Sequence, residues 1–72
     1  MKRAVFLFHT TTSAIRAEKE LKKAGLEVKL VPTPRELSSD CGIALQIEAG
    51  QAEEGARLLA EAKVEAELHW LD

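Results

Sequence analysis

The chain has 72 residues, a net charge of -2 at neutral pH and an isoelectric point near 5.7. This length has room for one small domain, 1–72, and a content of 46% hydrophobic and 31% charged residues is that of a folded protein. The acidic balance argues against nucleic-acid binding, which needs a basic face to neutralise phosphates. No apolar run approaches the ~20 residues that span a bilayer, so we expect a cytoplasmic protein that binds no membrane.

The first half of the chain predicts a strand, a helix and a second strand. The continuous apolar run in 4–8 is typical of a strand buried on both faces. Hydroxyl side chains then precede a helix over 13–24, in which Ala and Leu recur at helical spacing and Gly25 favours the end. In 26–31 apolar and charged residues alternate, which indicates a half-buried strand that ends at Pro32.

The second half repeats this order after a long loop, residues 32–42. Alternating apolar residues in 43–48 predict a third strand. Small and apolar residues at helical spacing in 52–62 predict a second helix after Gly50, and 64–70 alternates again as a fourth strand. We therefore expect an α+β fold, the ferredoxin-like split β-α-β arrangement, with an antiparallel sheet of order 4-1-3-2 and two helices on one face.

This topology gathers several polar residues at one end of the sheet. The first two strands end there, the third begins there, and the first helix begins there as well. His9, Thr10 and Thr11 would therefore lie near the loop 32–42. Because a helix amino end carries roughly half a positive charge and unpaired N–H groups, it would stabilise an anion at this place.

The loop contains Cys41, the chain's single cysteine. A loop of this length is uncommon in a compact domain unless it is functional or disordered. One cysteine forms neither an internal disulfide nor a paired-cysteine metal site, so we expect a free thiol, no metal and no cofactor. A thiolate beside the helix amino end would have a pKa below the ordinary thiol value. The alternative is a buried cysteine that only packs, but its polar neighbours favour a reactive one.

The neighbours of Cys41 each have a functional and a structural interpretation. Arg35, and His9 when protonated, would stabilise a thiolate, although an ion pair of Arg35 with Glu36 or Asp40 is an equal alternative. Capping alone explains the hydroxyl cluster that follows His9. Turn formation and stiffening explain the remaining loop residues, Pro34, Ser38, Ser39 and Asp40.

Two stretches of the chain resemble one protein family. The first is Phe-His-Thr-Thr at 8–11, followed by Ala14, Ala17, Glu18, Leu21 and Gly25. The second, more specific one is Pro-Arg-x-x-Ser-x-x-Cys-Gly at 34–42. Over nearly its full length the chain is similar to the small bacterial proteins of the selenium/sulfur carrier protein-like family. The resemblance implies that Cys41 carries sulfur or selenium between enzymes and is surrounded by Pro34, Arg35, Ser38, Ser39 and Gly42.

A carrier of this kind implies two partners and no stand-alone enzymatic activity. The donor would be a cysteine desulfurase or a selenocysteine lyase, and the cargo would pass to a downstream acceptor. Arg35 would steady the persulfide anion, and Gly42 would leave room for the donor. The alternative is a non-catalytic ligand- or protein-binding module that holds an anion at the first helix's amino end. A thiol redox enzyme is disfavoured because the chain has no second, resolving cysteine.

The first strand also bears on assembly, because it is apolar on both sides whereas helices would cover one face of the sheet. Either Val5 and Leu7 or Phe6 and Phe8 would then face something other than a helix. We therefore expect a homodimer through the open face of the sheet.

Overall fold

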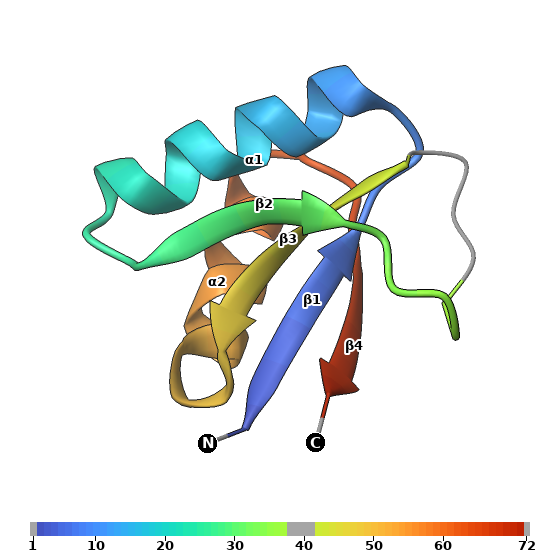
Figure 1. Ribbon diagram of the computed structural model, residues 1–72. Helices are drawn as coiled ribbons and strands as arrows, with labels where there is room; N and C mark the ends of the chain where they lie inside the picture. Colours follow the sequence, from blue (N-terminus) through green and yellow to red (C-terminus); the bar gives the residue numbers. More distant parts are fainter. Residues whose placement is uncertain (1, 38–41, 72) are drawn as a thin grey trace.

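The computed structural model describes residues 2–37 and 42–71. Its six elements, shown in Figure 1, are β1 (Arg3–Leu7), α1 (Thr11–Lys23), β2 (Val28–Pro32), β3 (Ile43–Glu48), α2 (Ala49–Glu61) and β4 (Glu67–Leu71). Their types and their order agree with the sequence prediction. The predicted bounds of the third strand are confirmed, and the other bounds differ by at most three residues.

The four strands form one antiparallel sheet in the order β2-β3-β1-β4. Read from the other edge, this order is 4-1-3-2. The central strands β1 and β3 pair Phe6 with Leu45, and β1 pairs Arg3 with Leu71 of β4. Because Arg3 and Leu71 are cross-strand partners, the two chain ends leave the sheet side by side, as Figure 1 shows. The element order and this pairing are those of a split β-α-β arrangement.

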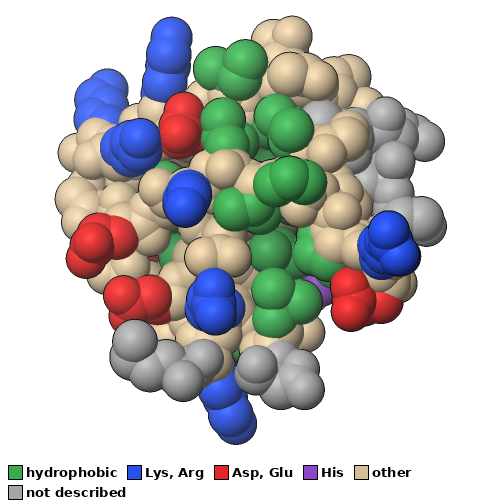
Figure 2. Space-filling view, in the orientation of Figure 1, with side chains coloured by type: hydrophobic (Ala, Val, Ile, Leu, Met, Phe, Trp, Pro, Cys, Tyr) green, Lys and Arg blue, Asp and Glu red, His purple; other side chains and the backbone are tan. Residues whose placement is uncertain are grey.

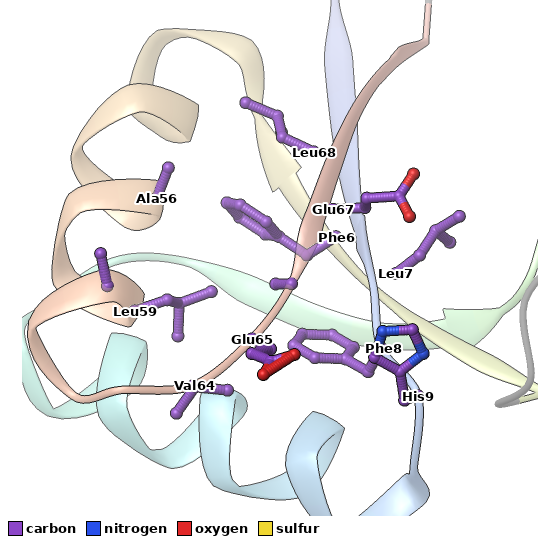
Figure 3. A pocket seen from close by; sticks show the side chains of 12 residues that line it. Phe6, Leu7, Phe8, His9, Ala56, Leu59, Val64, Glu65, Glu67 and Leu68 are labelled. Atoms are coloured by element: carbon purple, nitrogen blue, oxygen red, sulfur yellow. The ribbon is translucent and has the colours of Figure 1, made fainter.

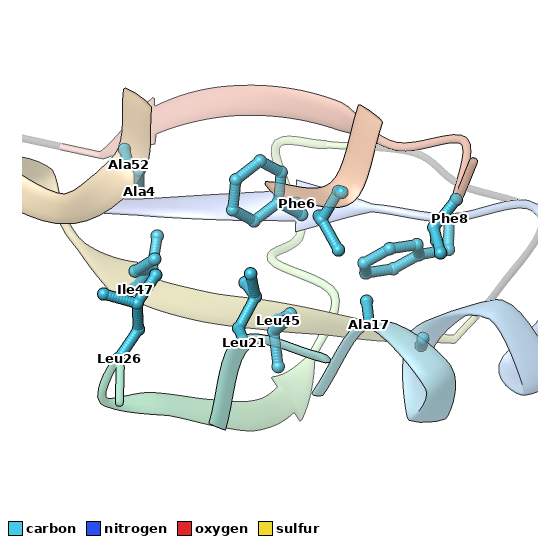
Figure 4. Close-up of a cluster of buried hydrophobic side chains, with 12 residues drawn as sticks. Ala4, Phe6, Phe8, Ala17, Leu21, Leu26, Leu45, Ile47 and Ala52 are labelled. Atoms are coloured by element: carbon cyan, nitrogen blue, oxygen red, sulfur yellow. The ribbon is translucent and has the colours of Figure 1, made fainter. Parts of the chain in front are cut away.

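Both helices pack on one face of the sheet, and the main hydrophobic core lies between the helices and the sheet (Figure 4). The sheet contributes Phe6, Leu45 and Ile47, which are almost fully buried. The buried residues of the helices are Ala14, Ala17 and Leu21 in α1 and Ala52, Gly55 and Leu59 in α2. A Cβ at Gly55 would lie 3.0 Å from Ile47 Cδ1, so the glycine allows α2 to approach the sheet closely.

Both helices end in the same hydrogen-bonded turn, a Schellman motif. In α1 the positive-φ residue is Gly25 (φ 89°), and the Leu26 N–H donates to the Leu21 carbonyl at 3.0 Å. In α2 the corresponding residue is Lys63 (φ 60°), and the next N–H donates back to the Leu59 carbonyl at 2.9 Å. Among the described residues, no helix has the length and apolar character that crossing a bilayer requires.

Two predicted boundaries were wrong for local reasons. The sequence predicts that the second helix follows Gly50, but Gly50 lies in the first turn of α2, which begins at Ala49. Val64 was placed in the fourth strand, but its N–H closes the turn after α2 and its side chain is buried in the main core. Strand β4 therefore begins three residues later, at Glu67.

The face of the sheet opposite the helices, called the open face below, carries a second small hydrophobic cluster. Val5 is 0% exposed and Leu7 is 6% exposed, and both pack with Ala44. The half-buried side chains that pack on this cluster are Val31, Leu37 and Leu71. In Figure 1 α2 lies behind the sheet, and Figure 2, in the same orientation, shows hydrophobic side chains gathered over the strands.

This cluster corrects the reasoning that led to a homodimer. Phe6 and Phe8 belong to the main core, whereas Val5 and Leu7 belong to the open-face cluster. Since Val5 and Leu7 are already buried within one chain, the premise that a second copy must cover them was wrong. This removes the argument from Val5 and Leu7, whereas the oligomeric state itself stays a prediction.

Candidate functional site

One end of the sheet combines the segments that the sequence singled out. The last paired residues of β1 and β2 are Leu7, opposite Ala44 and Glu67, and Pro32, opposite Ile43. Strands β1 and β2 therefore end where β3 and β4 begin. Helix α1 starts shortly after β1, so its amino end lies at the same end of the sheet, as the topology predicted (Figure 1).

Thr10 is the N-cap of α1. Its Oγ1 accepts a hydrogen bond from the Ser13 N–H at 3.1 Å and donates one to Ser13 Oγ at 3.0 Å. The bond from Ser13 satisfies an N–H group that the helix start would otherwise leave unpaired. Capping therefore explains why a hydroxyl residue stands at position 10. Thr11 is the first residue of the helix, and His9 is exposed just before the cap. The first turn of α1 has no acidic residue, so no carboxylate within that turn offsets its positive end.

The described part of the β2–β3 loop is held in place at its base and by one side chain. At the base, the Thr33 N–H donates to the Gly42 carbonyl at 3.1 Å. A turn follows, in which the Leu37 N–H donates to the Pro34 carbonyl at 3.0 Å. The Leu37 side chain then packs on the open-face cluster, so the loop folds back under the sheet. Sequence reasoning missed this role, although Leu37 is the only large aliphatic residue in 33–42.

Several site residues predicted from the sequence lie at this end of the sheet. Pro34 begins the loop turn, Arg35 at its centre is exposed, and Gly42 closes the base of the loop. The remaining predicted residues, Ser38, Ser39, Asp40 and Cys41, lie outside the described residues.

A cavity of about 580 Å³ lies between the carboxyl half of α2, the end of β1 and the start of β4. Its apolar lining includes Phe6, Phe8 and Leu59, and in Figure 3 the Phe6 ring lies between α2 and β4. His9 and Glu65 add polar groups. The residues that line it include none from 32–37 or 42, so within the described residues the cavity joins His9 to β4 rather than to the loop. Sequence reasoning missed the cavity because tertiary packing alone creates it.

Metal binding finds no support in the described ranges. Within 2–37 and 42–71, no three His, Cys, Asp or Glu side chains are grouped in a way that could hold a metal ion. On β4, His69 Nε2 and Glu67 Oε1 form an exposed contact of 3.0 Å.

Comparison with known proteins places this chain in a family. Among curated proteins, the uncharacterized protein YtiA of Escherichia coli (strain K12) is 35% identical over 54 residues, which are 75% of this chain and 64% of the relative. The chain thus spans less than two thirds of the length of that relative. No solved structure matches the chain significantly. A family model described as "Putative Se/S carrier protein-like" matches residues 3–70. Since this match covers almost the whole chain, the protein belongs to the Se/S carrier protein-like family.

Proposed function

We propose that this protein is a small carrier whose Cys41 accepts sulfur or selenium and delivers it to a second protein. The observation that carries the proposal is the family match over residues 3–70, in a chain with one cysteine. A carrier of sulfur or selenium needs a group that can form and break a bond to the cargo, and the thiolate of cysteine is such a group. No other residue of the chain offers a thiol.

The loading step is a thiol–persulfide exchange. The Cys41 thiolate attacks the outer sulfur of a donor persulfide, and a new S–S bond forms at Cys41 while the donor's S–S bond breaks. The donor cysteine leaves as a thiolate, so atoms and electrons balance without an added oxidant or reductant. With selenium as cargo, the bond formed and the bond broken are S–Se bonds, and the product is a selenosulfide. Delivery is the same exchange with an acceptor thiolate as the attacking group.

The described residues nearest to Cys41 in the chain leave room for an incoming protein. Gly42, which is bonded to Cys41, is exposed, and a methyl group built on it would meet nothing within 4 Å. The base of the loop is held by the Thr33–Gly42 hydrogen bond, at the end of the sheet where α1 begins. Arg35 is exposed in the same loop and would supply a positive charge to the persulfide anion.

The test is a mass measurement after incubation with a donor enzyme and its substrate. Wild-type protein treated with a cysteine desulfurase and cysteine, or with a selenocysteine lyase and selenocysteine, should gain one sulfur or selenium atom at Cys41. The Cys41→Ser variant should gain none, because a hydroxyl does not form the persulfide. A mass gain that persists in Cys41→Ser, or no gain in the wild type with either donor, would contradict the proposal.

The cavity beside His9 favours a second candidate, a ligand-binding module that does not use Cys41. Its volume of about 580 Å³ lies in the range of small-molecule sites, and its wall combines apolar side chains with the polar groups of His9 and Glu65. The carboxylate of Glu65 in its lining disfavours an anionic ligand within the cavity. Cys41→Ser separates the two candidates, since the carrier loses all transfer whereas the module binds its ligand unchanged.

A further inference from the structure

The outward surface of α1 is cationic and carries one exposed aliphatic side chain in its amino-terminal half. The three buried residues of α1 point to the core, and at about 100° per residue the opposite surface carries Thr12, Ile15, Lys19, Lys22 and Lys23, called the α1 face below. All five side chains are exposed. Ile15 is 42% exposed and is, with Trp70, one of two large hydrophobic residues exposed in the described part of the chain.

The other charged residues of α1 lie beside this surface and not on it. Glu18 and Glu20 are half-buried at its two flanks, and Glu18 forms an ion pair with Lys22 at 3.3 Å. Arg16 is directed to the neighbouring helix, because its Nη2 donates to the Ala62 carbonyl at 3.1 Å. The α1 face therefore presents three lysines, of which Lys22 is paired with Glu18 at the edge of the face.

Helix α2 has the opposite charge on its outward surface. Glu53, Glu54 and Glu61 are exposed there, and the cation of that helix, Arg57, pairs with Glu61 at 3.2 Å. Figure 2 shows Lys and Arg side chains gathered where Figure 1 places the second half of α1. The two helices on one face of the sheet thus make one side of the molecule positive and the adjacent side negative.

We propose that the α1 face is the docking surface for the sulfur-donating enzyme, which meets it with an acidic surface. This inference rests on the proposed carrier function. The lysines would steer an acidic partner onto α1, and Ile15 would supply an apolar contact between the lysines and the amino end of the helix. The acidic side of α2 would repel the same partner and so fix its orientation. Helix α1 begins at the end of the sheet where the Cys41 loop is attached, and its three lysines lie about 12–18 Å farther along the helix. A donor enzyme would therefore have to extend along α1 from the lysines to the proposed acceptor.

The test compares sulfur transfer to Cys41 from two sources, a cysteine desulfurase with cysteine, and cysteine persulfide, which needs no docking surface. Lys19→Glu with Lys23→Glu reverses the charge of the α1 face and leaves Lys22 with its partner Glu18. Transfer from the desulfurase should slow about tenfold or more, and its rate should no longer fall as the salt concentration rises. Loading by cysteine persulfide should stay at the wild-type rate.

A matched control places the same charge change on the other helix. Arg57→Glu with Lys63→Glu lowers the net charge by the same amount, with one change on α2 and one just after it. This variant should slow transfer from the desulfurase far less. Equal rates for the two double variants would overturn the inference, because net charge and not position would then control transfer. Ile15→Ser tests the same surface without a change in charge. It should slow transfer from the desulfurase and leave loading by cysteine persulfide unchanged. Circular dichroism checks that each variant is folded.

The same measurements separate this inference from the function on which it rests. If neither source loads Cys41, the carrier function fails and the docking surface fails with it. If cysteine persulfide loads Cys41 but the desulfurase does not, the docking surface alone is overturned. The same holds if the desulfurase loads the lysine double variant and Ile15→Ser at the wild-type rate.

Discussion

At the scale of single residues, the two helices end in the same turn but with a different residue in the left-handed position. Gly25 adopts φ 89° after α1 without steric cost, whereas Lys63 adopts φ 60° after α2 with a Cβ atom that crowds the following carbonyl. Both positions are closed by the same pair of hydrogen bonds, from the N–H groups of this residue and the next one. The strain at Lys63 is therefore local and should be relieved by one substitution.

Lys63→Gly should raise the free energy of unfolding by about 0.5–1 kcal/mol, because glycine adopts positive φ without the cost that a Cβ brings. Chemical denaturation monitored by circular dichroism measures the change. Lys63→Ala is the matched control: it removes the same charge, keeps the Cβ and should leave stability nearly unchanged. A gain of equal size in both variants would assign the effect to charge.

At the scale of elements, the β2–β3 loop is a folded extension of the sheet for as far as Leu37. Its base is closed by the Thr33–Gly42 hydrogen bond, its turn by the Leu37–Pro34 bond, and its apolar side chain rests on Val5 and Leu7. The side chain of Leu37 thus replaces part of the cover that a helix provides on the other face. We infer that this one residue sets where the loop attaches to the open face.

Leu37→Ala should lower the free energy of unfolding by about 1–2 kcal/mol, roughly half the cost of truncating a fully buried leucine. Ile15→Ala is the control, since Ile15 is an exposed aliphatic residue and its truncation should change stability by no more than about 0.5 kcal/mol. Equal losses in a urea titration of the two variants would show that Leu37 does not anchor the loop.

The elements themselves were largely predictable from local patterns. The alternation in Ile43–Glu48 and the helical spacing of Ala14, Ala17 and Leu21 follow from which side chains the sheet and the helix bury. The carboxyl end of α2 was not predictable in this way, because Lys63 takes a conformation that glycine usually adopts. Alternation then misplaced Val64 in a strand, although tertiary packing draws its side chain into the core after the helix has ended.

The candidate site was predictable only as a place in the topology. The order of the strands indicated that His9, Thr10 and the loop 32–42 share one end of the sheet, and the structure confirms this for His9, Thr10 and the described loop residues 32–37 and 42. The anchoring of Leu37 and the cavity beside His9 depend on contacts between segments far apart in the sequence, and no local pattern reports them.

At the scale of the whole molecule, the sheet buries most apolar side chains of its central strands β1 and β3 on both faces within one chain. Two helices cover one face, and neighbouring strands together with Leu37 cover Val5 and Leu7 on the other. Val31 and Leu71 pack on the same cluster and are themselves half-buried. We therefore expect a monomer rather than a homodimer.

Light scattering at several protein concentrations checks this expectation, and the measured mass should equal that of one chain throughout. A mass that rises with concentration would contradict it. In that case Leu37→Glu, which places a charge on the open face, would show whether that face is the interface by restoring the monomer mass. Ile15→Glu, which places a charge at an exposed position on α1, is the control for Leu37→Glu.

The pairing of Arg3 with Leu71 also has a practical consequence for experiments on this molecule. Because β1 runs from Arg3 toward the loop-bearing end, both termini emerge at the opposite pole of the sheet (Figure 1). A fluorophore, resin or fusion partner attached at either terminus would therefore leave the cysteine-bearing pole open to an incoming enzyme. The same proximity means that a short peptide linker would close the backbone into a circle without altering the sheet.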